Sequence, residues 1–184
     1  MAHLFPKLAT LALISALSLP AGAETPDITG HWRSVAPETQ GQITATREFR
    51  IDATGWSVTF RAHADAGATM PLFRLEVSGV YVIGGSSTDV PDAHEAIFPA
   101  TRRVLTAESP AGVALFAGMG CALVEGEPMV LTDRGCGFVP GLMQAMGEYD
   151  LVAVRDGQLF FGDRAGDLTR ERPAALTPFP LVRQ

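Results

Sequence analysis

The side chain with the clearest chemical meaning is an arginine that interrupts an apolar strand pattern. From Gln42 to Ile51 the even positions are all polar, whereas the odd positions are apolar except for Arg47. This alternation predicts a strand with one face turned inward, and Arg47 lies on that face. A buried guanidinium needs a partner. Arg47 therefore pairs with a core carboxylate, packs on the ring of Trp32, or binds the anionic head group of a fatty acid or similar ligand.

Aromatic side chains occupy the same inward phase of the neighbouring strand patterns. Trp56 and Phe60 alternate with polar residues, and Tyr81 continues the phase of Phe73. Such residues either line a cavity or fill a core, and the pattern alone does not choose between the two. On the first interpretation the predicted ligand-binding residues are Arg47, Phe49, Trp56, Phe60, Phe73 and Tyr81.

Patterns typical of catalytic or metal sites do not occur in the sequence. His31, His63 and His94 are scattered and lack the i, i+4 spacing of a helical zinc site. The segment Gly84–Ser87 lacks the spacing of a nucleophile elbow, and no phosphate-binding loop is present. We therefore predict no catalytic residue, no metal and no cofactor.

The two cysteines, Cys121 and Cys136, are predicted to form a disulfide. An exported chain meets an oxidising compartment, in which such a pair is normally bonded. The bond would close a modest loop and contribute about 3 kcal/mol to stability. A redox pair or a pair of metal ligands is the alternative, which the absence of a short Cys spacing disfavours.

Export is predicted from the beginning of the chain. Lys7 precedes an apolar run from Leu8 to Leu19, and small residues follow up to Ala23. The run is too short to span a bilayer and is typical of a secretory signal peptide, for which we expect cleavage after Ala23. Residues 24–184 are then expected to form one soluble domain, periplasmic or secreted. We expect no membrane anchor, because no lipid-attachment cysteine follows the apolar run.

The acidic composition limits the classes of partner. Lys7 is the only lysine, so the chain from residue 24 onward keeps 13 of the 14 basic residues against all 20 acidic residues, a net charge of −7. Nucleic acids and anionic membrane surfaces are bound mainly through clustered positive charge. The composition therefore argues against both as partners, while oligomeric state stays open.

Strand periodicity extends along most of the chain. A turn at Asp52–Gly55 separates two alternating runs, and a further strand is expected over Leu72–Ile83. Two short strands are expected on either side of Pro99. Asp156–Gly157 gives a strong two-residue hairpin signal between the last two runs.

Short helical segments and a proline-rich tail complete the pattern. Ser109–Met119 begins with Ser and Pro and predicts a short helix, and Phe138–Met146 predicts another helical turn. The tail Arg172–Gln184 contains three prolines and is expected to lie along a sheet edge rather than to pair centrally. The predicted fold is all-β with one or two short helices, as an antiparallel β-barrel of about eight strands. A β-sandwich is the alternative.

A short motif ahead of these strands is similar to the Gly-x-Trp signature of lipocalins. In this chain it reads Gly30, His31, Trp32. The resemblance implies a lipocalin-like barrel in which Gly30 and Trp32 have structural roles. Trp32 would close one end of the barrel, and an arginine from another strand would pack on its indole ring.

A wider set of residues resembles the adenomatosis-polyposis-coli-down-regulated domain family, whose members are Wnt-pathway inhibitors with bacterial relatives. The matching positions cover most of the chain after residue 23: Glu38–Ile51, Trp56, Gly79, Tyr81, Cys121, Cys136, Glu148–Val152, Arg172, Pro173 and Leu181. The resemblance implies a lipocalin-like barrel that accepts an acyl chain. The cysteines that animal members carry near the positions of Pro37 and Ala66 are missing, as is their transmembrane anchor, so Wnt binding does not carry over.

These patterns together predict an exported, soluble, non-enzymatic protein that binds a lipid or other hydrophobic small molecule in its barrel. Burial of an acyl chain among aromatic and aliphatic side chains would supply the binding energy. Two alternatives stay open: a cell-envelope interaction module with a filled core, and a periplasmic hydrolase or isomerase with titratable groups in its pocket. A cavity, and the groups that line it, would distinguish these functions.

Overall fold

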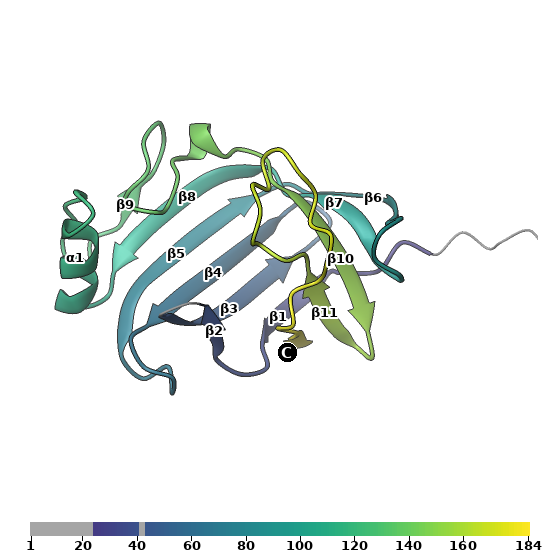
Figure 1. Cartoon of the computed structure of the whole chain (residues 1–184), viewed down its shortest axis with the longest axis horizontal. Helices are drawn as coiled ribbons and strands as arrows, with labels where there is room; N and C mark the ends of the chain where they lie inside the picture. Colours follow the sequence, from purple (N-terminus) through teal and green to yellow (C-terminus); the bar gives the residue numbers. More distant parts are fainter. Residues whose placement is uncertain (1–23, 41–42) are drawn as a thin grey trace, which may run out of the picture.

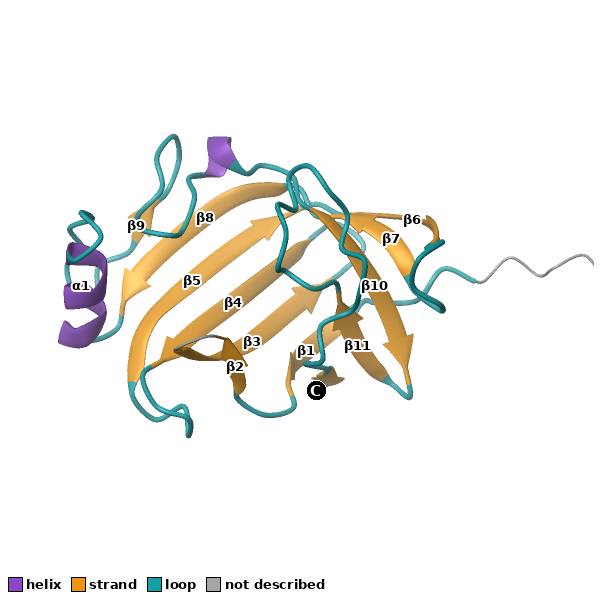
Figure 2. Ribbon diagram, viewed as in Figure 1, coloured by secondary structure: helices purple, strands orange, loops and turns teal. Residues whose placement is uncertain are grey.

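The computed structural model describes residues 24–40 and 43–184, so the predicted signal peptide and its cleavage point lie outside the described residues. The described chain folds into one antiparallel β-sheet with one short α-helix and one turn of 3-10 helix (Figure 1, Figure 2). The prediction of an all-β fold with one or two short helices is therefore confirmed.

Twelve strands form the sheet, and eleven of them follow one continuous path. Their bounds are β1 Gly30–Ser34, β2 Glu38–Gln40, β3 Ile43–Ile51, β4 Trp56–His63, β5 Pro71–Gly79, β6 Val82–Ser86, β7 His94–Ile97, β8 Ala100–Ala107, β9 Met129–Val130, β10 Tyr149–Arg155, β11 Gln158–Phe161 and β12 Leu181–Arg183. The spatial order is β6, β7, β10, β11, β12, β1, β3, β4, β5, β8, β9, and β2 pairs with β3 beside this path. The helical elements are α1 Pro110–Ala117 and η1 Leu142–Gln144.

The sheet curls strongly but does not close, so it forms a half-barrel (Figure 2). β6 and β9 lie at the two ends of the path, and across residues 24–40 and 43–184 they do not pair with each other. The predicted closed barrel of about eight strands is therefore wrong. The structure has more strands, several of them short, and they leave the curled sheet open.

A sharp bend in two paired strands accounts for this difference. The single strand expected over Leu72–Ile83 is divided into β5 and β6, and its partner is divided into β8 and β7 at Phe98–Pro99. Gly79 permits a close approach at the bend, because a Cβ on this residue would lie 1.9 Å from the carbonyl oxygen of Pro99. Beyond the bend β7 pairs with β10 and β10 with β11, which brings Phe161 of β11 against Phe49 of β3, with ring centroids 4.6 Å apart.

Two predicted hairpins are confirmed. β3 and β4 pair in register around the turn at Asp52–Gly55, whose first residue accepts hydrogen bonds at its carboxylate from two backbone amides of the turn. β10 and β11 are joined by Asp156 and Gly157, both with positive φ (51° and 74°). This backbone conformation is that of a type I′ turn, which matches the right-handed twist of the flanking strands.

The two helical segments lie where the sequence predicts them. α1 begins at Pro110, and the Ser109 hydroxyl caps it by accepting a hydrogen bond from the Gly112 amide (3.2 Å). Phe116 of α1 packs edge-on against Phe73 of β5, with ring centroids 5.1 Å apart. α1 thus covers one end of the half-barrel (Figure 1), and η1 supplies the helical turn expected within residues 138–146.

The C-terminal tail lies more centrally than the sequence predicts. Its prolines favour a sheet edge, yet β12 pairs with β11 on one side and with β1 on the other. The last proline is Pro180, so Leu181–Arg183 keep all their backbone N–H groups and can pair on both sides. The edge prediction is wrong for these three residues, because the prolines precede the strand instead of interrupting it.

Two large hydrophobic clusters occupy the two ends of the half-barrel. The Trp32 cluster contains Trp32 with, among others, Phe49, Phe98 and Phe161. The Phe116 cluster contains Phe116 with Phe73 and both cysteines, among others. The predicted disulfide between Cys121 and Cys136 is confirmed, with a Cα–Cα distance of 5.4 Å. The middle of the concave face of the sheet therefore lies between the Trp32 cluster and the Phe116 cluster.

Candidate ligand-binding cavity

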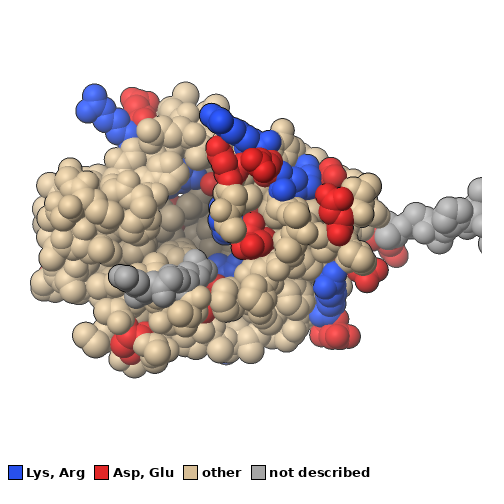
Figure 3. All heavy atoms as spheres, in the orientation of Figure 1, with Lys and Arg blue, Asp and Glu red and all other residues tan. Residues whose placement is uncertain are grey.

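A cavity of about 320 Å³ lies between the Trp32 cluster and the Phe116 cluster and takes part of its lining from each. Figure 3 shows a recess on this face of the molecule, with acidic and basic side chains gathered on one side of it. The apolar lining includes Phe49, Trp56, Val58, Phe60, Leu75 and Phe161. The charged lining consists of Arg47, Arg103, Glu148, Asp150, Asp163 and Arg164.

The pairing of β3, β4 and β5 builds the floor of the cavity. Alternate residues of a strand share one face of a sheet, and Phe49, Val58 and Val77 lie directly opposite one another across these three strands. Arg47 pairs with Phe60 in the next row. The residues predicted from the sequence to point inward therefore lie on the face of the sheet that lines the cavity.

Most of the predicted ligand-binding residues meet at this cavity. Its lining includes five of the six, namely Arg47, Phe49, Trp56, Phe60 and Phe73. Tyr81 does not line it: the ring stacks on Phe98 with centroids 6.0 Å apart, and the hydroxyl donates to the carbonyl of Asp52 (3.0 Å). The bend at Gly79 takes Tyr81 out of the phase of β5, which sequence periodicity could not predict.

Gly30 and Trp32 lie within the packing of the Trp32 cluster. The Trp32 side chain is 1% exposed, and its Nε1 donates a hydrogen bond to the carbonyl of Ile28 (2.8 Å). The guanidinium of Arg183 in β12 lies over the indole ring, 4.5 Å from its centroid, so the arginine on this ring is Arg183 and not Arg47. A Cβ on Gly30, whose φ is +133°, would lie 3.0 Å from the same guanidinium.

Arg47 pairs with a buried carboxylate, as one interpretation of the sequence predicts. Its Nε lies 2.9 Å from Oε2 of Glu38, and the two side chains are 9% and 2% exposed. Glu38 also accepts a hydrogen bond from the Ser34 hydroxyl (2.6 Å), and Arg47 donates to the carbonyl of Phe179 (2.8 Å). These contacts hold Arg47 at the cavity wall and compensate its charge.

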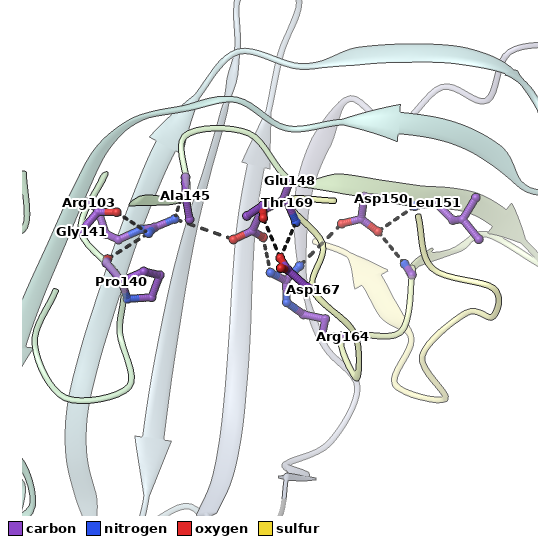
Figure 4. Close-up of polar contacts among 11 residues, drawn as sticks. Arg103, Pro140, Gly141, Ala145, Glu148, Asp150, Leu151, Arg164, Asp167 and Thr169 are labelled. Carbon is purple, nitrogen blue, oxygen red and sulfur yellow. Dashed lines mark hydrogen bonds and ion pairs between the residues drawn. The ribbon is translucent and has the colours of Figure 1, made fainter. Parts of the chain in front are cut away.

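A second group of charges forms a chain along the wall (Figure 4). Arg103 of β8 is 5% exposed and donates hydrogen bonds to three backbone carbonyls of the loop 140–145. It lies 3.8 Å from Glu148, which also pairs with Arg164, and Arg164 lies 3.7 Å from Asp150. Positive and negative groups thus alternate, and they connect β8, β10 and the loop that follows β11.

Asp150 titrates far from the ordinary range of an aspartate. It is 4% exposed, and its Oδ1 accepts hydrogen bonds from the amides of Leu151 (2.8 Å) and Gly162 (2.7 Å). Burial raises the pKa of Asp150 from 3.8 to about 6, and this outweighs the opposing effects of Arg164 and of the two amides. Both carboxylate oxygens already have partners, since Oδ2 faces Arg164.

Sequence reasoning missed Arg103, Glu148, Asp150 and Arg164 as cavity residues. Asp150 stands directly before the apolar run of the last hairpin, but that run does not alternate with polar residues, so it lacks the signal that identifies Arg47. Arg103 follows another arginine, and Arg164 lies in a loop, so periodicity does not single out either residue. Glu148 precedes its strand and carries no signal of this kind.

The three histidines of the described residues lie outside the cavity lining. His31 lies 2.7 Å from Glu48, and a ring nitrogen of His94 lies 3.3 Å from the carbonyl of Gly84. His63 is buried near the end of β4 and, like the other two, does not line the cavity. Among the described residues, no three His, Cys, Asp or Glu side chains are grouped in a way that could hold a metal ion.

Comparisons with known proteins leave the family open. A scan against protein-family models and a search of curated proteins both give no match. The resemblance to lipocalins and to the adenomatosis-polyposis-coli-down-regulated domain family therefore stays a prediction. Within the part of the chain that the structure describes, no helix has the length and apolar character needed to cross a membrane.

Proposed function

We propose that this protein binds one apolar or amphipathic small molecule in the cavity between the Trp32 cluster and the Phe116 cluster. The observation that carries the proposal is the cavity of about 320 Å³ on the aromatic inner face of the half-barrel. Small-molecule sites span about 300–1,000 Å³, so this cavity is at the small end of the range. It suits a single acyl chain or a compact apolar molecule better than a lipid with two chains.

Partly exposed apolar side chains favour a binding site over a filled core. Trp56, Val58, Phe60 and Leu75 line the cavity and are only partly buried. A module with a filled core would bury such side chains against one another. Covering them with an apolar ligand would gain about 25 cal/mol for each Å² removed from water.

The charged wall supports binding without chemistry. A hydrolase or isomerase would need titratable groups that are free to exchange a proton with a substrate. Asp150 and Glu148 line the cavity, but Asp150 is engaged by two amides and Arg164, and Glu148 pairs with both Arg103 and Arg164. These contacts hold three segments of the wall together, and this structural role is enough to account for the two carboxylates.

An exported location, periplasmic or secreted, is part of the same proposal. The first residues have the pattern of a signal peptide, and the disulfide between Cys121 and Cys136 suits an oxidising compartment. A protein that carries an apolar ligand through an aqueous compartment needs a cavity that shields the ligand from water. Amino-terminal sequencing of the exported protein tests this location, with Glu24 expected as the first residue.

A cavity-filling variant tests the binding function. Val58→Trp places a large side chain in the cavity, whereas Thr59→Trp places the same side chain on the opposite face of β4. Binding of a fluorescent probe, whose emission rises in apolar surroundings, is measured for both variants and for the unmodified protein. We expect binding to be lost in Val58→Trp and kept in Thr59→Trp. Equal binding by the two folded variants would refute a site in this cavity.

Extraction of the native protein identifies the ligand itself. The protein is purified from its native compartment without detergent, extracted with organic solvent and analysed by mass spectrometry. We expect one class of small apolar molecule in near-stoichiometric amount. The Val58→Trp variant, purified in parallel, should yield little of this molecule and so distinguishes cavity binding from surface carry-over.

A further inference from the structure

The guanidinium groups that line the cavity are paired with carboxylates of the protein, and this pairing restricts the head group of a ligand. Such a restriction presupposes the proposed binding function. The guanidinium groups of the lining are those of Arg47, Arg103 and Arg164. Their carboxylate partners are those of Glu38, Glu148 and Asp150, with Glu148 shared by two arginines. Each positive charge at the cavity is therefore compensated within the protein.

An anionic head group is poorly accommodated by this set of charges. It would bring another negative charge to a wall where Asp163 already adds a carboxylate beyond the paired ones. Burying an ion without a compensating charge is costly, and an arginine could bind it only by giving up a protein carboxylate. A cationic head group would in turn have to displace an arginine from its carboxylate.

We propose that the ligand is a single-chain lipid with an uncharged, hydroxyl-bearing head group, such as a long-chain alcohol or a monoacylglycerol. A hydroxyl both donates and accepts hydrogen bonds. It can accept from a guanidinium such as that of Arg164 and donate to a neighbouring carboxylate without breaking the ion pairs. The chain lies over the aromatic floor formed by β3, β4 and β5, while the head group meets the alternating charges of the wall.

Two probes of equal chain length test this inference. Decan-1-ol and decanoate compete against the fluorescent apolar probe at pH 8, where decanoic acid is ionised. We expect decan-1-ol to displace the probe at a concentration at least about tenfold lower than decanoate. Equal or tighter binding of decanoate overturns the inference but leaves the cavity function standing. If neither decan-1-ol nor decanoate displaces the fluorescent probe, and Val58→Trp binds that probe as well as the unmodified protein does, the binding function itself is overturned.

A variant of the wall shows whether its charges cause this preference. Glu148→Gln keeps the shape of the side chain and removes the carboxylate that Arg103 and Arg164 share. We expect the affinity for decanoate to rise at least about tenfold, while the affinity for decan-1-ol changes by less than about twofold. The control Glu127→Gln removes the same charge from an exposed loop outside the cavity lining and should change neither affinity.

The decisive quantity is the ratio of the affinity for decan-1-ol to the affinity for decanoate. If Glu148→Gln leaves this ratio as it is in the unmodified protein, the paired charges do not select the head group and the inference is wrong. If this variant does not fold, Glu38→Gln makes the equivalent change beside Arg47 at the other ion pair. The same rise in decanoate affinity is then expected, and its absence has the same meaning.

Discussion

Replacing Asp150 with asparagine should remove an unusual contribution to the dependence of stability on pH. The Asp150 side chain is buried, and burial raises its pKa from 3.8 to about 6. A carboxyl group with a higher pKa in the folded state binds its proton more tightly there, so protonation favours folding. The resulting stability is complete below pH 3.8 and is lost as the pH rises through about 6, which is opposite to the behaviour of an ion-paired carboxylate.

The magnitude follows from the two pKa values of Asp150. They differ by roughly 2, which corresponds to about 3 kcal/mol. Asparagine has nearly the same shape and does not titrate, and its Oδ1 can still accept hydrogen bonds from the amides of Leu151 and Gly162. We therefore expect the free energy of unfolding of Asp150→Asn, relative to the unmodified protein, to rise by about 2–3 kcal/mol between pH 4 and pH 7.

Urea unfolding at several pH values measures this difference, with constant ionic strength and an intact disulfide. Other titrating groups cancel in the comparison, including Asp52 and Asp65, whose pKa values are lowered by hydrogen bonds. A difference that stays constant, or that falls as the pH rises, would refute the reasoning. It would mean that Arg164 and the two amides outweigh burial in setting the pKa of Asp150.

Three other perturbations act on packing and pairing. The double substitution Cys121→Ser, Cys136→Ser should lower the free energy of unfolding by about 3 kcal/mol in urea titrations, and no change would show that the bond does not constrain the unfolded chain. Arg47→Met should lower the free energy of unfolding by about 3–5 kcal/mol, because it leaves Glu38 buried without its charge partner. In a double-mutant cycle, adding Glu38→Met should recover most of this loss. Gly79→Ala should lower the thermal midpoint by several degrees, because its Cβ would lie 1.9 Å from a backbone oxygen; an unchanged midpoint contradicts the tight bend.

Strands and turns could be predicted because they depend on residues close together in the chain. The alternation from Ile43 to Ile51 is set by the two-residue period of a strand, and the structure buries the predicted face. The turn at Asp156–Gly157 needs two residues with positive φ, and the residue types indicate this directly. The disulfide was predictable for a simpler reason, since the chain has only two cysteines and they leave one possible pairing.

Closure of the sheet and most of the charged wall could not be predicted, because both depend on distant residues. The bend needs Gly79 and Pro99 to approach each other, and strand periodicity carries no information on that distance. Arg103 reaches Glu148 across 45 positions of sequence, through a loop whose path the residue pattern does not determine. The sequence pattern also could not identify the partner of Arg47, since any carboxylate in the core would have satisfied it.

The open sheet explains why this cavity needs a charged wall. In a closed barrel, backbone hydrogen bonds run all the way round and hold the wall in place. Here the backbone hydrogen bonds between the start of β8 and the segment before β10 lie near the bend, where the Phe98 amide donates to the carbonyl of Glu148 (3.1 Å) and the Ala100 amide to that of Met146 (2.6 Å). Farther from the bend, Arg103 binds three loop carbonyls, and the pairs through Glu148 and Arg164 tie the remaining segments. The same side chains thus take the place of missing strand pairing and line the cavity with compensated charges. Under the proposed binding function, a change in one of these residues should therefore alter stability and ligand preference together.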